Sequence, residues 1–154
     1  MLLISFKDMS SYFFETQHWK ILLKSDQRYL GSLIIKTKES RQHLPDLTVD
    51  EQLDFFVLIK KLESFFTEKI GATMFNYSCL MNNAYRDNET PHVHYHFRPR
   101  YKNPVTILGQ EFSDPNFGEH YLSASLDGNG DVIIDDYIHT YLRNEIINYL
   151  QQSI

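Results

Sequence analysis

Pro91-His-Val-His-Tyr-His-Phe-Arg-Pro-Arg100 is the stretch that decides the fold, because polar and apolar residues alternate from its second to its seventh position. In a β-strand, side chains two positions apart share one face of the sheet, so the alternation predicts a strand with a histidine face and an apolar face. The histidine face carries His92, His94 and His96. Imidazole can serve as nucleophile, acid, base or metal ligand near neutral pH. This row is therefore the candidate functional site, with a purely structural strand as the alternative.

The composition places this row in one ordinary globular domain. The chain has 154 residues, of which 42% are hydrophobic and 23% charged, and this predicts a single domain over residues 1–154. A formal net charge of −5 argues against broad nucleic-acid binding, which requires a cationic surface. The one cysteine, Cys79, allows no intramolecular disulfide. With neither a signal-peptide pattern nor a membrane-spanning pattern, the expected location is the cytoplasm.

The longest element predicted outside the histidine row is a helix from Thr48 to Ile70. Thr48 and Glu51 form a capping-box signature at its start, and Gly71 suits its end. The apolar residues recur at helical spacing, which predicts a helix that packs its apolar stripe on a sheet. They are Phe55, Leu58, Ile59, Leu62, Phe65, Phe66 and Ile70.

Short apolar runs on either side of this helix predict strands. Before it, Trp19–Leu23 and Leu30–Lys36 are predicted strands joined by the polar turn Ser25–Arg28. After it, Thr73–Leu80 is a third predicted strand. The polar segment 82–90 is then interpreted as a loop that leads into the histidine row, a kind of position that often carries function.

The sequence after the histidine row predicts a hairpin and two turns. Pro104–Ile107 is a predicted strand that turns at Gly109-Gln110 into Glu111-Phe112. The segments 113–118 and 127–130 are rich in Gly, Asn, Asp and Ser, and each predicts a turn.

A final helix is predicted from Asp136, as its cap, to about Gln151. Its apolar positions include Tyr137, Tyr141, Ile146 and Leu150, while Ile133 and Ile134 leave its start open. Because strands and helices do not alternate regularly along the chain, the pattern favours an α+β layer fold over a doubly wound one.

The first chemical interpretation of the histidine row is a zinc site. Two imidazoles at i and i+2 on a strand can bind one zinc ion when a third ligand comes from elsewhere. The histidines available for this are His18, His43, His120 and His139. No His-Glu-x-x-His helix and no cysteine pair supplies a recognisable partner set, so we expect no metal.

The second interpretation is covalent chemistry at phosphorus. An imidazole nitrogen can attack an α-phosphate, expel the leaving group and hold the nucleotidyl group until water removes it. Flanking histidines and amides would stabilise the equatorial oxygens and protonate the leaving group. This step needs one nucleophile between two helpers, and His94 has the central place.

The residues from His92 to Tyr101 resemble the signature of the histidine triad (HIT) family. In that signature His-φ-His-φ-His-φ-φ, with φ apolar, precedes a Pro-Arg-Tyr-like end. The resemblance covers roughly residues 12–101. Further matching segments, in the family's usual order, are Glu15-Thr-Gln-His-Trp19, Gly31 before Leu33-Ile-Ile35, Leu44-Pro-Asp-Leu-Thr48 and Phe75-Asn76. A subset of small microbial members is also similar in Asn82–Arg86 and Gly109–Tyr121.

The resemblance implies a HIT-like α+β fold: a mostly antiparallel five-stranded sheet, one long packed helix and a C-terminal helix, with 102–154 as a C-terminal extension of the same domain. It also implies a homodimer that binds a purine nucleotide or dinucleoside polyphosphate and needs no cofactor. Its activity would be release of nucleoside monophosphates from dinucleoside polyphosphates or nucleoside phosphoramidates.

The resemblance also implies a role for each histidine. His94 would be the nucleophile, His96 would bind the α-phosphate, and His92 would orient His94 or the backbone. A histidine at the third position, where transferase relatives carry glutamine, favours the hydrolase-like branches.

Other residues are candidate substrate contacts because of where they stand in the family pattern. Asn82 is expected near the ribose or phosphate, and Asp26 near the ribose hydroxyls. Ser32 replaces a family histidine, and Glu89 lies in Asp87–Thr90, which replaces a Gly-Gln-Ser/Thr loop.

An acidic side chain at Glu89 would repel phosphate unless it points away. The guanidinium groups of Arg86, Arg98 and Arg100 can compensate, since guanidinium suits phosphate oxygens. The alternative for each arginine is a solvated surface or salt-bridge residue. These departures leave an alternative: a HIT protein that binds nucleotide but turns over little substrate.

Overall fold

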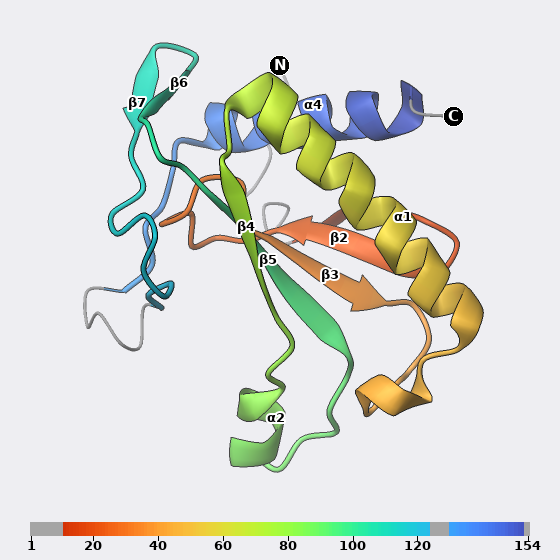
Figure 1. The fold of residues 1–154 in the computed structure, drawn as a ribbon. Coiled ribbons are helices and arrows are strands. Elements are labelled where there is room, and N and C mark those ends of the chain that lie inside the picture. The colour runs from red at the N-terminus through yellow and green to blue at the C-terminus, as the bar shows by residue number, and fades with distance from the viewer. Residues whose placement is uncertain (1–10, 124–129, 153–154) are drawn as a thin grey trace.

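A computed structural model describes residues 11–123 and 130–152 (Figure 1). Their centre is a five-stranded sheet of order β1-β2-β3-β5-β4, in which every neighbouring pair is antiparallel. The strands are β1 (Tyr12–Glu15), β2 (Trp19–Leu23), β3 (Leu33–Thr37), β4 (Met74–Ser78) and β5 (His94–Arg100). The predicted α+β class and five-stranded antiparallel sheet are confirmed. The histidine strand β5 is held between β3 and β4.

Helix α1 (Val49–Phe65) covers one face of this sheet (Figure 1). The predicted capping box is present: Thr48 Oγ1 accepts from the Glu51 amide at 3.2 Å, and the Glu51 carboxylate accepts from the Thr48 amide at 2.8 Å. A short 3₁₀-helix, η1 (Leu44–Asp46), precedes it. The helix ends through a π-helical turn, η2 (Phe66–Ile70), and Gly71 adopts the left-handed conformation at φ 104°. Both predicted ends of this helix are therefore confirmed.

Helix α4 (Asp136–Gln152) packs against α1 and β1. Asp135 precedes it, and its carbonyl accepts from the amides of Ile138 and His139, each at 3.0 Å. Asp136 is predicted as the cap, but the helix begins one residue earlier than that, with Asp135 before it. The predicted apolar positions Ile146 and Leu150 are buried, whereas Tyr137 is exposed; Leu142 and Arg143 belong to the buried side as well.

Several predicted boundaries are wrong. Strand β3 begins at Leu33, not Leu30, because Gly31 makes a tight turn at φ 86° against the ring of Phe66. The predicted loop 82–90 contains helix α2 (Asn82–Arg86). Strand β1 had no counterpart in the prediction, and His92 lies just before β5 and outside it.

The predicted hairpin after β5 is present as β6 (Val105–Ile107) paired with β7 (Gln110–Phe112). Its turn lies at Leu108-Gly109, one residue earlier than predicted, and both residues have positive φ, 49° and 82°. The turn predicted at 127–130 falls mainly outside the described residues.

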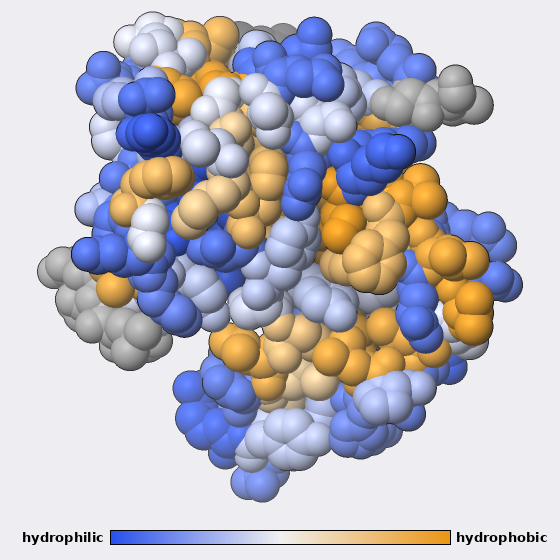
Figure 2. All heavy atoms as spheres, viewed as in Figure 1, coloured by the Kyte–Doolittle hydropathy of each residue, from blue (hydrophilic) through white to orange (hydrophobic). Residues whose placement is uncertain are grey.

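The outer surface of α1 carries apolar side chains beside polar ones, as Figure 2 shows for the face of the molecule seen in Figure 1. The exposed apolar residues of this helix are Val49, Leu53, Phe56 and Val57. Within the described part of the chain, no helix has the length and apolar character needed to cross a membrane.

Candidate active site

Strand β5 keeps the two faces that its alternation predicts. Tyr95 faces α1 and stacks on Phe55 with ring centroids 4.4 Å apart, and Phe97 is fully buried on the same side. His94 and His96 face the other way, with ring centroids 5.2 Å apart. The apolar face anchors the strand under the helix, so the imidazole face is presented on a rigid support.

An open cavity of ≈ 570 Å³ lies on the imidazole face. All three histidines of the row line it, together with Asn82 and Arg98. Its other walls come from the end of β2, from β3, from the segment around the start of α2, and from residues 120–123. The cavity thus combines five of the ten residues that the sequence singles out as catalytic groups or substrate contacts.

Two backbone carbonyls determine which ring nitrogens of His92 and His94 carry hydrogen. His92 Nε2 lies 2.9 Å from the Thr37 carbonyl oxygen, and His94 Nδ1 lies 2.8 Å from the His92 carbonyl oxygen. A carbonyl oxygen only accepts, so each of these nitrogens donates. In neutral His94 the other nitrogen, Nε2, therefore has a free lone pair, as a nucleophile requires. The His92 backbone orients His94, while the His92 ring is tied to β3.

His96 has a buried ring nitrogen, Nδ1, with no hydrogen-bond partner among the described residues. Burial, together with the positive charges of Lys24 and Arg98, lowers the pKa of His96 to about 3. The ring is therefore neutral at pH 7. Buried polar atoms in proteins are nearly always hydrogen-bonded, so this unpaired nitrogen, on a ring that lines the cavity, is an unusual feature of the site.

Arg98 supplies positive charge at the same cavity. Its side chain is 5% exposed, donates to Ser78 Oγ at 3.0 Å and lies 3.8 Å from the ring centroid of Tyr121. Asn82, at the start of α2, also lines the cavity and is exposed to solvent. The arrangement offers a nucleophile, an unpaired imidazole and a cation to one ligand.

A family model described as HIT domain matches residues 6–103. The chain belongs to the HIT family. This span contains β1 to β5, α1 and the whole histidine row, and it agrees with the region of resemblance predicted from the motifs. No curated protein sequence matches this HIT protein.

Solved structures of other HIT proteins share its fold. A histidine triad protein from Marinobacter aquaeolei superimposes with a TM-score of 0.69 at 16% identity, covering 96% of this chain and 93% of the other. A histidine triad protein from Bradyrhizobium japonicum gives 0.62 at 14% identity, covering 93% and 92%. A diadenosine triphosphate hydrolase from Plasmodium falciparum gives 0.59 at 16% identity, covering 92% and 77%.

Three predicted contacts of this HIT protein lie outside the cavity wall. Asp26 Oδ1 accepts from the amides of Arg28 and Val132, at 3.2 and 3.0 Å, so this oxygen joins two loops. Ser32 is buried and donates to the Tyr29 carbonyl at 2.6 Å. Glu89 is exposed beyond the end of α2, where its side chain does not line the cavity.

Of the three arginines expected to compensate for Glu89, the structure brings only Arg98 to the site. Arg86 is exposed and pairs with its neighbour Asp87, with Nε 2.7 Å from Oδ1. Arg100 is completely buried in an ion pair with Asp114, also at 2.7 Å. Arg86 and Arg100 are therefore salt-bridge residues, which is the alternative to a phosphate contact that the sequence leaves open for each arginine.

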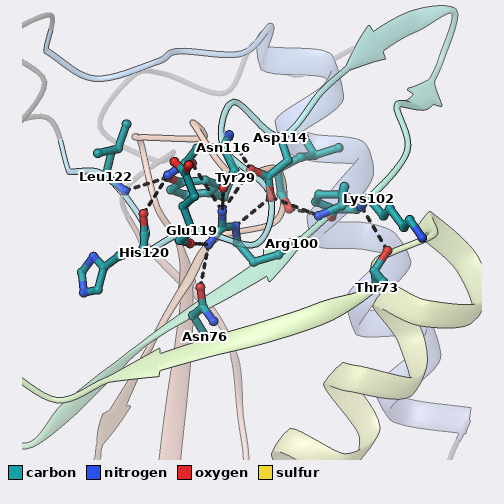
Figure 3. A network of polar contacts seen from close by, with 12 residues as sticks. Tyr29, Thr73, Asn76, Arg100, Lys102, Asp114, Asn116, Glu119, His120 and Leu122 are labelled. Carbon is teal, nitrogen blue, oxygen red and sulfur yellow. Dashed lines mark hydrogen bonds and ion pairs between the residues drawn. The ribbon is translucent and has the colours of Figure 1, made fainter.

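Arg100 instead ties the C-terminal extension to β5 (Figure 3). Its guanidinium also donates to Asn76 Oδ1, at 2.8 Å, and to the carbonyls of Glu119 and Asn116, at 2.9 and 2.8 Å. The same segment is held by the Tyr29 hydroxyl, which donates to Asn116 Oδ1 at 2.7 Å. Arg100 lies two residues after Arg98 on β5. Its network therefore places residues 120–123 along the cavity that Arg98 also lines.

Lys24, His120 and Tyr121 line the cavity but were not predicted as substrate contacts. For Lys24 the sequence contains a signal. Lys24 directly follows β2, so the alternation of faces along this strand places it on the face opposite Leu23, just before the predicted turn Ser25–Arg28. For His120 and Tyr121 no local signal exists, because their position depends on Arg100 and Asp114.

The zinc alternative has no ligand set in the described part of the chain, where no group of three or more His, Cys, Asp or Glu side chains is arranged to hold a metal ion. Of the four suggested third ligands, His120 lines the histidine cavity, whereas His18, His43 and His139 do not.

Proposed function

We propose that this HIT protein is a nucleotide-binding phosphohydrolase that cleaves at the α-phosphate of dinucleoside polyphosphates or nucleoside phosphoramidates. The observation that carries the proposal is the tautomer of His94. With Nδ1 donating to the His92 carbonyl, Nε2 keeps its lone pair, beside a His96 nitrogen that has no partner among the described residues.

In the first step His94 Nε2 attacks the α-phosphorus, forming a P–N bond, and the bond from phosphorus to the leaving group breaks with its electron pair. A phosphate leaving group departs as the anion, whereas the nitrogen of a phosphoramidate takes a proton from solvent as it leaves. The ring becomes positively charged, and its Nδ1–H donates more strongly to the His92 carbonyl than before, which stabilises the intermediate. Arg98 offsets negative charge on the non-bridging phosphoryl oxygens. His96, which is neutral at pH 7, can hydrogen-bond one of these oxygens without adding charge.

In the second step water attacks the same phosphorus and releases the nucleoside monophosphate. The P–N bond breaks, its electron pair returns to Nε2, and the proton from water is lost to solvent. His94 is then restored in its original tautomer, since Nδ1 has kept its hydrogen bond to the carbonyl throughout.

Two relatives support the nucleotide assignment. The Plasmodium falciparum structure is named a diadenosine triphosphate hydrolase. A Sulfolobus tokodaii structure, with a TM-score of 0.64 at 11% identity over 92% of this chain and 83% of the other, is named a hypothetical histidine triad nucleotide-binding protein. A purine nucleotide is accordingly the proposed ligand of the cavity.

The test is a substrate panel of diadenosine polyphosphates and adenosine phosphoramidate, combined with mass-spectrometric trapping of a nucleotidyl adduct. The wild-type protein should hydrolyse at least one substrate and carry the adduct, and His94→Ala should do neither. His43→Ala is the matched control, because His43 is exposed near η1, away from the cavity. Turnover without any adduct on wild-type protein would overturn the covalent mechanism.

Tight nucleotide binding without turnover would instead support the alternative of a binding protein. That alternative was motivated by Ser32 and Glu89, and neither side chain lines the cavity. The homodimer and the cytoplasmic location stay predictions; size-exclusion chromatography with light scattering tests the first.

A further inference from the structure

Lys24 and Arg98 lie in one row across the sheet. The Lys24 amide donates to the Ser32 carbonyl at 3.0 Å, which extends the β2–β3 pairing beyond Leu23↔Leu33. The β3–β5 register pairs Leu33 with Phe97, so one residue further on Ser32 is opposite Arg98. Since Leu33 and Phe97 are buried toward α1, Lys24 and Arg98 are directed to the other face, where both line the cavity.

The two cations are close enough to affect each other and His96. Burial lowers the pKa of Lys24, and the positive charge of Arg98 lowers it further. After burial itself, Lys24 is the strongest influence that lowers the pKa of His96. Lys24 and Arg98 therefore both lie near His96 on the cavity face of the sheet.

No carboxylate neutralises this pair within the described residues. Neither Lys24 nor Arg98 forms an ion pair there. Asp26 raises the pKa of both cations and Asp131 that of Lys24, yet burial and Arg98 outweigh them at Lys24, whose pKa is lowered. Placing two partly desolvated cations side by side is unfavourable, and an anion bound between them would offset that cost.

The cationic pair is also more than one phosphate requires. The proposed reaction places one phosphoryl group at His94 and His96, and Arg98 alone can neutralise it. Lys24, on the other side of Ser32 in the same row, is a second cation beyond the one that this group requires. Its charge suits a second anionic group on the same ligand.

We propose that Lys24, together with Arg98, binds a second phosphate of the ligand, next to the phosphate that His94 attacks. This inference rests on the proposed function and names a further requirement of the same site. The second phosphate can belong to the 5′ phosphate chain or to the ribose, and the chemistry of recognition is the same for both.

Isothermal titration calorimetry without divalent cations tests this with AMP, ADP and adenosine 3′,5′-bisphosphate, none of which requires turnover. Wild-type protein should bind ADP or the bisphosphate about tenfold more tightly than AMP, as one charge-assisted hydrogen bond predicts. Lys24→Met should abolish this preference and leave AMP within about twofold. Lys24→Arg should retain the preference. Lys60→Met, which removes a lysine charge from exposed α1, is the matched control.

The ligand that shows the preference identifies where the second phosphate is carried. Equal weakening of all three ligands by Lys24→Met, or a wild-type protein that does not distinguish them, would overturn the role of Lys24. These outcomes leave the proposed function intact. Absence of binding by any of the three to wild-type protein would contradict the proposed function itself, and this inference with it.

Discussion

Arg100 and His96 lie on the same face of β5, four residues apart, and the structure treats their polar atoms in opposite ways. Arg100 is completely buried, and its guanidinium is bonded to Asp114, Asn76 and two backbone carbonyls. His96 Nδ1 is equally shielded from water and has no partner in the described residues. The hydrogen-bonding groups of Arg100 are thus satisfied by the protein itself, whereas His96 Nδ1 is left without a partner among the described residues.

The difference separates structural from functional polar groups. A fully paired buried cation stabilises one arrangement of the chain, in this case the attachment of residues 114–120 to β5. An unpaired buried nitrogen costs free energy unless something binds to it. The transition between the two lies at Arg98, which has one hydrogen bond, one aromatic contact and a place in the cavity wall.

The largest expected effect is at the histidines of β5 that line the cavity. His94→Ala removes the proposed nucleophile, so kcat/KM for the best substrate should fall about 10⁴-fold or more. The free energy of unfolding, from urea titration, should change by less than about 1 kcal/mol, since His94 lines an open cavity. A residual rate within tenfold of wild type would show that another group attacks the phosphorus.

At Arg100, whose polar groups are paired within the protein, the effect should be on stability. Arg100→Ala leaves the Asp114 carboxylate buried and unpaired and should lower the free energy of unfolding by about 3–5 kcal/mol, measured by urea denaturation. Replacing both partners, in Arg100→Met with Asp114→Leu, should recover part of that loss, because no unpaired charge remains. If Arg100→Ala is as stable as wild type, the distinction between a structural Arg100 and a functional His96 fails.

An intermediate result is expected at Arg98. Arg98→Met should weaken AMP binding about 10- to 100-fold, as loss of a charge-assisted contact of about 1.5–3 kcal/mol predicts. Its effect on the free energy of unfolding should be smaller than that of Arg100→Ala, since Arg98 has no buried carboxylate partner among the described residues. Arg98→Lys, which keeps the charge, should retain part of the affinity; calorimetry and urea titration measure both quantities.

The smallest expected effect is the pH dependence of stability. The pKa of His96 is about 3 in the folded protein, lowered by burial, and about 6.5 when unfolded. Between these values the unfolded chain binds a proton that the folded chain does not, so stability is lost as pH falls below about 6.5. From pH 7 to pH 5 wild-type protein should lose about 1–2 kcal/mol more than His96→Asn.

The comparison between the two variants is needed because His139 acts in the same direction. Its pKa is lowered to about 4 by burial, and it contributes equally to both proteins. Identical pH profiles of wild type and His96→Asn would show that His96 is not shielded from solvent.

Local patterns predicted the features that depend on neighbours in the chain. The alternation around His94 predicted a two-faced strand because side chains at i and i+2 share a face whatever the strand pairs with. Thr48 and Glu51 predicted the helix start because the capping box closes within four residues. Gly71 predicted its end because the left-handed conformation is easily reached only without a side chain.

Contacts between distant segments account for what was missed. Arg98 and Arg100 look alike in the sequence, and only the return of Asp114 to β5 makes one structural and leaves the other at the cavity. Lys24 and Arg98 are separated by more than seventy positions, and the register of β2, β3 and β5 brings them into one row.

By itself, the sequence determined the fold class, the faces of the histidine strand, the ends of the long helix and the family, since each depends on the spacing of residues that are close together in the chain. Only the tertiary structure decided which nitrogen of His94 is free, which arginine reaches the cavity and that Lys24 joins it. The free nitrogen of His94 depends on the backbone conformation that brings the His92 carbonyl to Nδ1, two residues away. The other two depend on Asp114 and on strand register, and these pairings exist only once the sheet has closed around β5.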